Sequence, residues 1–164
     1  ETGNRCMMVE IQTLMCRTAY GLPRRMSLGV DFNRLVVLIA VLEKRCGLVL
    51  GAQDVYLNAM GGIRLNEPSA DLAVCAALAS AEKMTPVEKY TAVFGEVGLT
   101  GEVRGVNCAD KRVNECLKMG FRRVVLPEKN MKACEKFKGK IELVPVRYVS
   151  EMIKALFPKE PGQA

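Results

Sequence analysis

The sequence predicts an α/β fold in which a mixed sheet is flanked by helices. Segments in which apolar and polar residues alternate, as in strands, take turns with segments whose apolar residues recur at helical spacing. One pair of strand-like segments surrounds the turn signal Gly98-Leu99-Thr100-Gly101, which is typical of a hairpin. Alternating strands and helices with one hairpin indicate a sheet that contains both parallel and antiparallel pairs.

The first half of the chain is expected to form a long helix among three strands. Asp31 is placed to cap this helix, which runs to about Cys46, and Gly47 is placed to end it. The strands are expected over 6–15, 26–30 and 54–60, with a turn at 21–23 and a break at Gly61-Gly62.

The second half is expected to alternate helices and strands. Helices are predicted over 69–82, 109–119, 130–137 and 147–157. Strands are predicted in the hairpin segment 91–106 and over 121–126 and 140–144. We expect one domain over 1–157 and a disordered tail over 158–164.

Length and composition limit the possible classes of protein. A chain of 164 residues, 49% of them hydrophobic, can bury a core without disulfides or metals. The longest apolar run, 35–42, is far shorter than the roughly 20 residues that a membrane-spanning helix needs. Because the sequence begins with Glu1, we expect it to be a fragment or a processed product.

Cysteine usage favours a reducing compartment and argues against a metal site. The cysteines are odd in number and widely spaced, and the chain has no C-x-x-C pattern and no histidine. They are Cys6, Cys16, Cys46, Cys75, Cys108, Cys116 and Cys134. We therefore expect a cytoplasmic protein with no metal site and no cofactor in this chain. The absence of histidine also excludes Ser-His and Cys-His nucleophile pairs.

The net charge points to an anionic partner. The formal charge is +6, whereas aromatic residues are only 5% of the chain and tryptophan is absent. Any nucleic-acid binding should therefore depend mainly on phosphate contacts.

Ser69 lies at a corner between a predicted strand and a predicted helix. Across Pro68-Ser69 the pattern changes from alternating to helical spacing. Such a corner can present a serine nucleophile, but it is also where an ordinary helix takes an N-cap. The pattern leaves both interpretations open.

Three ordered blocks carry a resemblance to a known family. LNEPSADLAVCAALAS, FGEVGLTGEVRGV and KMGFRRVVLPEKN resemble the proteolytic domain of the Lon family, which has a Ser-Lys dyad. VEIQTL, GLPRRMSLGVDFNRL and the spacing from GEVGLTGEVR to GFRRVVLP are closer still to the Lon-like C-terminal domain of the RadA (Sms) family of bacterial DNA repair proteins. The resemblance implies a Lon proteolytic domain-like fold, of the ribosomal protein S5 domain 2-like type.

The match to the dyad is incomplete. Ser69 occupies the nucleophile position, but Asp110 occupies the position of the general-base lysine. Lys111 is adjacent, but one helical step turns a side chain by about 100°, so Lys111 should point in another direction. Glu67 and Asp71 stand where the family has glycines, and their charges should repel a developing oxyanion. We therefore expect no peptidase activity, with Ser69 retained as a helix cap.

The resemblance implies another role for such a domain. In the RadA family it is a platform that forms a ring, which we expect to be hexameric, and that binds single-stranded or branched DNA beside an ATPase. The chain has no G-x-x-x-x-G-K-[ST] motif, so ATP, magnesium and zinc are expected in the missing part of the parent protein.

Several basic residues are candidates for DNA contacts. The candidate arginines are Arg24, Arg25, Arg122 and Arg123. A basic run, Lys129, Lys132, Lys136, Lys138 and Lys140, is more typical of a solvated face. For the pair Arg24 and Arg25, a salt bridge across a subunit interface is an equal alternative. An active Ser-Lys peptidase and an RNA-binding module remain the alternative functions.

Overall fold

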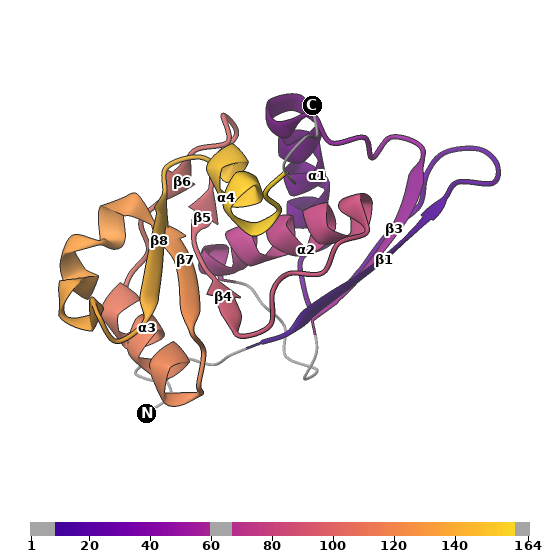
Figure 1. Ribbon diagram of the computed structural model, residues 1–164. Helices are drawn as coiled ribbons and strands as arrows, with labels where there is room; N and C mark the ends of the chain where they lie inside the picture. Colours follow the sequence, from indigo (N-terminus) through magenta and orange to yellow (C-terminus); the bar gives the residue numbers. More distant parts are fainter. Residues whose placement is uncertain (1–8, 60–66, 160–164) are drawn as a thin grey trace.

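The computed structural model of the protein describes residues 9–59 and 67–159 (Figure 1). Strands and helices alternate along these residues, and helices flank the sheets, so the predicted α/β class is confirmed. The strands form three separate sheets, one of which is mixed, where the sequence had suggested a single mixed sheet. In the described part of the chain, no helix is long and apolar enough to cross a membrane.

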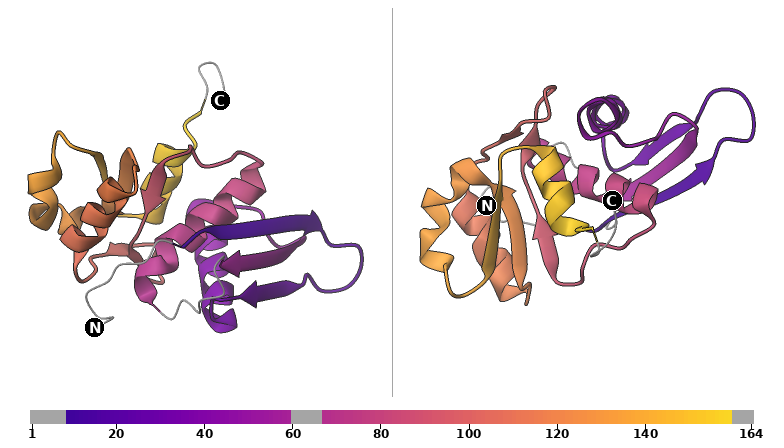
Figure 2. Two further views of the ribbon diagram at one scale, coloured as in Figure 1. Left: turned by 90° about the horizontal axis from the view of Figure 1, so that it is seen from below. Right: turned by 45° about the horizontal axis from the view of Figure 1, so that its top comes forward.

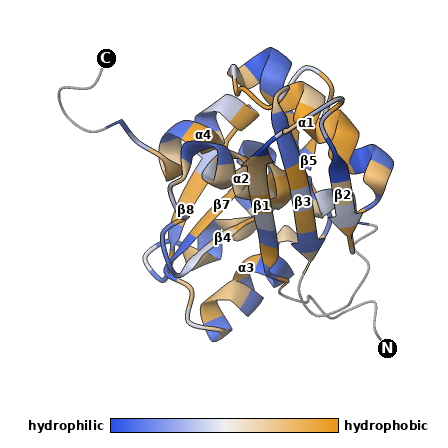
Figure 3. Cartoon of the chain, turned by 90° about the vertical axis from the view of Figure 1, so that its right-hand side faces the viewer, coloured by the Kyte–Doolittle hydropathy of each residue, from blue (hydrophilic) through white to orange (hydrophobic). Residues whose placement is uncertain are grey.

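The N-terminal sheet has the order β1-β3-β2 (Figure 3). β1 (Ile11–Arg17) pairs antiparallel with β3 (Gln53–Ala59), and β2 (Arg25–Leu28) pairs parallel with β3. All three strands were predicted, with ends that differ by a few residues. The predicted start of the first strand at 6–8 and the break at Gly61-Gly62 lie outside the described residues.

α1 (Phe32–Cys46) has the predicted ends. The Asp31 carboxylate accepts a hydrogen bond from the Arg34 backbone N–H at 3.1 Å, which satisfies one of the free donors of the first turn. Gly47 closes the helix at φ 71°, a left-handed conformation that glycine adopts without steric cost.

The second sheet is entirely parallel and lies in the C-terminal half. Its order is β4-β7-β8, formed by β4 (Thr91–Val93), β7 (Arg123–Pro127) and β8 (Glu142–Val146). α3 (Ala109–Lys118) precedes β7, and α4 (Val149–Leu156) follows β8.

The predicted hairpin is shorter than its sequence segment. β5 (Glu96–Val97) and β6 (Val103–Arg104) pair antiparallel around the turn at 98–101. The turn is closed by a hydrogen bond from the Gly98 N–H to the Glu102 carbonyl at 2.9 Å. The beginning of the segment forms β4 instead, because it pairs with β7 and not with the hairpin.

α2 (Asp71–Lys83) lies between the two three-stranded sheets (Figures 1 and 2). It is apolar on nearly every side, with Leu72, Val74, Cys75 and Leu78 buried, as a helix covered from two directions requires. The main core gathers around it, and a second core packs α3 and the following turns against β7.

The helix predicted over 130–137 is instead a pair of 3₁₀ helices, η3 (Glu128–Asn130) and η4 (Lys132–Phe137). The buried residues of η4 are Cys134 and Phe137. They are three positions apart, which matches the three-residue turn of a 3₁₀ helix. Of the predicted tail over 158–164, residues 160–164 lie outside the described residues.

Candidate functional site

The corner that carries Ser69 is a short 3₁₀ helix, η2 (Pro68–Ala70), directly before α2. Its position is fixed by the chain after β4: the Gly95 N–H donates to the Ser69 carbonyl at 2.9 Å, and the Leu72 N–H donates to the Gly95 carbonyl at 3.0 Å. Ser69 itself is buried, with 7% of its surface exposed.

The prediction that Ser69 caps α2 is wrong. The N-cap of α2 is Ala70, and no side chain provides a cap hydrogen bond there. Pro68 starts the helical path early, so Ser69 lies inside the 3₁₀ turn and not at the position directly before α2. The last extended residue before the turn is Glu67, at φ −91° and ψ 123°.

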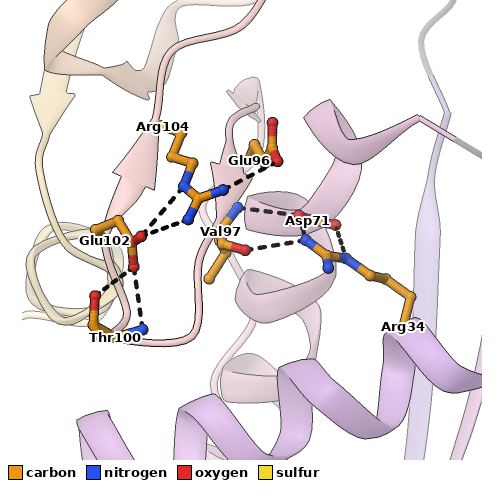
Figure 4. Close-up of polar contacts among 7 residues, drawn as sticks. All are labelled: Arg34, Asp71, Glu96, Val97, Thr100, Glu102 and Arg104. Atoms are coloured by element: carbon orange, nitrogen blue, oxygen red, sulfur yellow. Dashed lines mark hydrogen bonds and ion pairs between the residues drawn. The ribbon is translucent and has the colours of Figure 1, made fainter.

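Asp71 is a buried ion-pair partner, 3% exposed (Figure 4). Its carboxylate accepts two hydrogen bonds from the Arg34 guanidinium, one of them from Nε at 2.9 Å, and a third from the Val97 N–H at 3.0 Å. The same guanidinium donates to the Val97 carbonyl at 3.0 Å. Asp71 therefore ties α1, α2 and β5 together, and its charge is compensated.

Glu67 is paired as well. Its carboxylate accepts from an Arg112 guanidinium nitrogen at 2.7 Å, so α3 and the corner are in contact. The two negative charges expected at the corner are therefore both paired with arginines. Both carboxylates have arginine partners that lie 37 and 45 residues away in the sequence.

Asp110 lies in the first turn of α3 and is held in its charged form. A hydrogen bond from the Lys111 backbone N–H, and to a smaller extent the Lys136 ammonium, lower the pKa of the Asp110 carboxyl. The ammonium lies 3.5 Å from the carboxylate. An ionised carboxylate offers no neutral amine at this position, and the pair joins α3 to η4.

A cavity of about 340 Å³ opens beside the corner. Its charged lining consists of one arginine and four carboxylates: Arg34, Asp31, Glu67, Asp71 and Glu96. Ser69 is not among its lining residues. An excess of carboxylates around the opening does not suit the stabilisation of an oxyanion.

A second polar cluster surrounds the hairpin turn (Figure 4). The Glu102 carboxylate accepts from the Thr100 hydroxyl at 2.5 Å and from Arg104 at 2.9 Å. The Thr100 hydrogen bond is the main reason why the pKa of Glu102 falls to about 2. Arg104 also faces Glu96 at 3.8 Å, so this arginine is engaged with two carboxylates.

The first pair of candidate arginines divides into one structural residue and one exposed residue. The Arg25 guanidinium donates to the Leu50 carbonyl at 3.0 Å and also to the Gln53 carbonyl. It thus fastens β2 to the turn before β3. Arg24 is exposed, and its backbone N–H donates to the Asp54 carboxylate at 2.7 Å.

The second pair divides in the same way. Arg123 donates to the Thr91 hydroxyl at 3.3 Å and faces the Glu88 carboxylate at 4.0 Å. Arg122 is exposed and lies over the Tyr90 ring. The loop between β1 and β2 and the loop between α3 and β7 lie at opposite ends of the molecule (Figure 1), so the two pairs do not form one surface.

The lysines of the basic run are all exposed. They surround η3 and η4, and Lys136 is the one paired with Asp110. No group of three or more metal-ligating side chains is arranged to hold an ion in residues 9–59 and 67–159.

Sequence reasoning missed Arg34, Arg112 and Tyr90. The first two bind carboxylates that the sequence did highlight, but each partner comes from a distant element, and no spacing pattern marks such a pair. Tyr90 follows Lys89 in the sequence, whereas Arg122 reaches it only through the pairing of β4 with β7.

Comparison with known proteins gives a consistent result. Residues 50–159 match the model of the Lon protease (S16) C-terminal proteolytic domain. DNA repair protein RadA of Bacillus subtilis is 47% identical over 152 residues, which are 93% of this chain and 33% of that protein. The RadA proteins of Halalkalibacterium halodurans and Streptococcus pyogenes serotype M3 are 50% and 44% identical, over 79% and 94% of this chain.

These alignments cover 28% of the Halalkalibacterium protein and 34% of the Streptococcus protein, so the chain spans about a third of the length of the curated relatives it matches. The family match extends from the turn before β3 to beyond α4 and includes both Ser69 and Asp110. The chain belongs to the family of the Lon protease (S16) C-terminal proteolytic domain.

Proposed function

We propose that this chain is a peptidase-inactive Lon-like domain of a RadA-type DNA repair protein, and that it serves as a ring-forming scaffold and a DNA-binding platform. Its partners are single-stranded or branched DNA and further copies of the same chain, in a hexameric ring in the cytoplasm. ATP, magnesium and zinc act in the remainder of the parent protein. The names of the relatives and their length, about three times that of this chain, support this role.

The charged state of Asp110 is the observation that carries the proposed loss of peptidase activity. A Ser-Lys dyad needs a neutral amine that takes the serine proton. The corresponding position holds a carboxylate whose pKa is lowered and which is paired with Lys136. Arg112, which contacts the corner through Glu67, carries a guanidinium, which offers hydrogen-bond donors and no acceptor for the serine proton.

The distribution of charge supports the DNA-binding part of the proposal. The chain carries a formal charge of +6, and Arg24, Arg122 and the lysines of the basic run are exposed. Weak phosphate contacts of this kind gain in strength when several protomers present them on one ring.

The experiment is a binding titration across a salt series, with the solution mass measured at the same protein concentrations. Fluorescence anisotropy follows a labelled single strand, a branched DNA and a structured RNA, and analytical ultracentrifugation gives the mass. The proposal expects a ring and an affinity that falls with salt at a log-log slope of about 0.7 for each phosphate contact on a single strand. A monomer that shows no DNA binding at low salt overturns the proposal. Tighter binding to the structured RNA than to the DNA favours an RNA-binding module.

An active Ser-Lys peptidase is the second candidate, favoured by membership of the Lon domain family. A serine-reactive probe distinguishes the two. The proposal expects no labelling of Ser69, whereas labelling of the intact chain that disappears in Ser69→Ala would establish a reactive serine.

A further inference from the structure

An exposed tyrosine lies beside two cations at the entry to β4. The central carbon of the Arg122 guanidinium is 4.9 Å from the centroid of the Tyr90 ring, and the Lys89 ammonium is 5.5 Å from it. Tyr90 is 43% exposed, and the side chains of Lys89 and Arg122 also face solvent. One spot on the surface thus combines an aromatic ring with two positive charges.

The backbone fixes this arrangement. Tyr90 has φ 66°, a left-handed conformation that bulky residues rarely adopt. Its carbonyl accepts hydrogen bonds from the N–H groups of Arg122 at 2.9 Å and Arg123 at 3.3 Å. Because these bonds hold the start of β4 against the start of β7, the ring and the guanidinium stay together. An unfavourable backbone conformation kept at an exposed aromatic residue suggests that its side chain has a use.

The neighbouring carboxylate does not cancel the positive charge. Glu88 faces Arg123 at 4.0 Å, and Arg123 is 16% exposed and also donates to the Thr91 hydroxyl. Glu88 is therefore offset by an arginine that is itself held in place. Lys89 and Arg122 remain available to an anion.

We propose that Tyr90 and Arg122 form a stacking contact for one unpaired base of single-stranded DNA, while Lys89 binds a neighbouring phosphate. A tyrosine ring, a guanidinium and a base are all planar, so a base can stack on the ring or on the guanidinium beside it. The lysine stem is flexible, which lets its ammonium follow the phosphate. The inference rests on the proposed DNA binding and names one contact for it.

The test compares two oligonucleotides of equal length, oligothymidine and a strand of abasic sites, by fluorescence anisotropy with the full chain. The wild type should bind oligothymidine more tightly, because the abasic strand has phosphates but no bases. Tyr90→Asn should weaken oligothymidine binding at least about fivefold and leave the abasic strand unaffected. Asparagine tolerates the left-handed backbone, so this variant should fold.

Further variants separate the ring from the charge. Tyr90→Phe keeps the ring and should bind as the wild type does. Arg122→Lys keeps the charge but loses the planar group, and it should lose part of the preference for bases. Lys89→Gln should weaken binding to both strands, and Lys154→Gln, on the exposed side of α4, is its charge-matched control.

The outcomes separate this inference from the proposed function. Suppose that the wild type binds DNA and that Tyr90→Asn binds each strand as tightly as the wild type does. The stacking contact is then wrong, and the DNA-binding role stands. Equal losses on the two strands would also refute stacking, because they indicate a phosphate contact alone. If the wild type binds neither strand, both the contact and the DNA-binding role are wrong.

Discussion

The Arg34 guanidinium binds the Asp71 carboxylate through two nitrogens, and this pair joins the first turn of α1 to the first turn of α2. The Asp71 carboxylate is thus integrated into the fold, together with the Val97 N–H that donates to it at 3.0 Å.

Asp71→Asn should lower the free energy of unfolding by about 2 to 3 kcal/mol, because it leaves Arg34 without its charged partner. The loss is smaller than for a fully buried pair, since the Arg34 side chain is 36% exposed. Urea denaturation measures it. Glu128→Gln, which affects an exposed pair with Arg147, is the control and should change stability by less than about 1 kcal/mol. Equal effects of the two substitutions would contradict the structural role of Asp71.

Asp110→Lys alone should not produce a peptidase. Glu67 and Asp71 would still place two carboxylates at the corner, and their arginine partners hold them there. Turnover of a fluorogenic peptide is the measurement, with Asp110→Lys combined with Ser69→Ala as its control. Turnover in the single variant that vanishes in the double variant would show that the lysine was the missing element.

Arg25→Ala should destabilise the protein by about 1 to 2 kcal/mol, because the carbonyls of Leu50 and Gln53 lose a charged donor. Arg24→Ala, at the neighbouring exposed position, should change stability by less than about 0.5 kcal/mol. Thermal denaturation compares the two. If Arg24→Ala were the more destabilising change, the division into a structural and an exposed arginine would be wrong.

Glu102→Gln should weaken the dependence of the free energy of unfolding on pH at acid pH. The folded pKa of Glu102, about 2, is below its ordinary value of 4.5, so its contribution is fully present above pH 4.5 and is lost as the pH falls toward 2. The contribution should be at most about 1 kcal/mol, because the pair with Arg104 is exposed to solvent. Urea titrations between pH 2 and 5 follow it, and parallel profiles for wild type and variant would contradict the shifted pKa.

The parts of the fold set by local chemistry could be predicted from the sequence. Asp31 and Gly47 delimit α1 as expected, because a cap and a left-handed glycine act within a few residues. The turn at 98–101 was predicted for the same reason. The division of the strands into separate sheets was not, because β4 could pair with the hairpin or with β7, and the alternation of residues is the same in both cases.

The sequence identified residues of the candidate site but not the partners that they contact. Ser69 was identified from the pattern around the corner, and Glu67 and Asp71 from the resemblance to the Lon family. Neither could show that Arg34 and Arg112 reach these carboxylates from other helices. Arg25 and Arg123 were interpreted as candidate DNA contacts because one lies in a predicted turn and the other at the start of a predicted strand, where an arginine can reach a phosphate. In the structure they bind backbone carbonyls and neighbouring side chains, while Arg24 and Arg122 are exposed.

The Asp71–Arg34 pair also limits what positions 34 and 71 can accept. A glycine at position 71 would leave the Arg34 guanidinium and the Val97 N–H without the carboxylate that they share. A polar group that loses its partner on folding costs free energy. The two positions can therefore change without loss of stability only together.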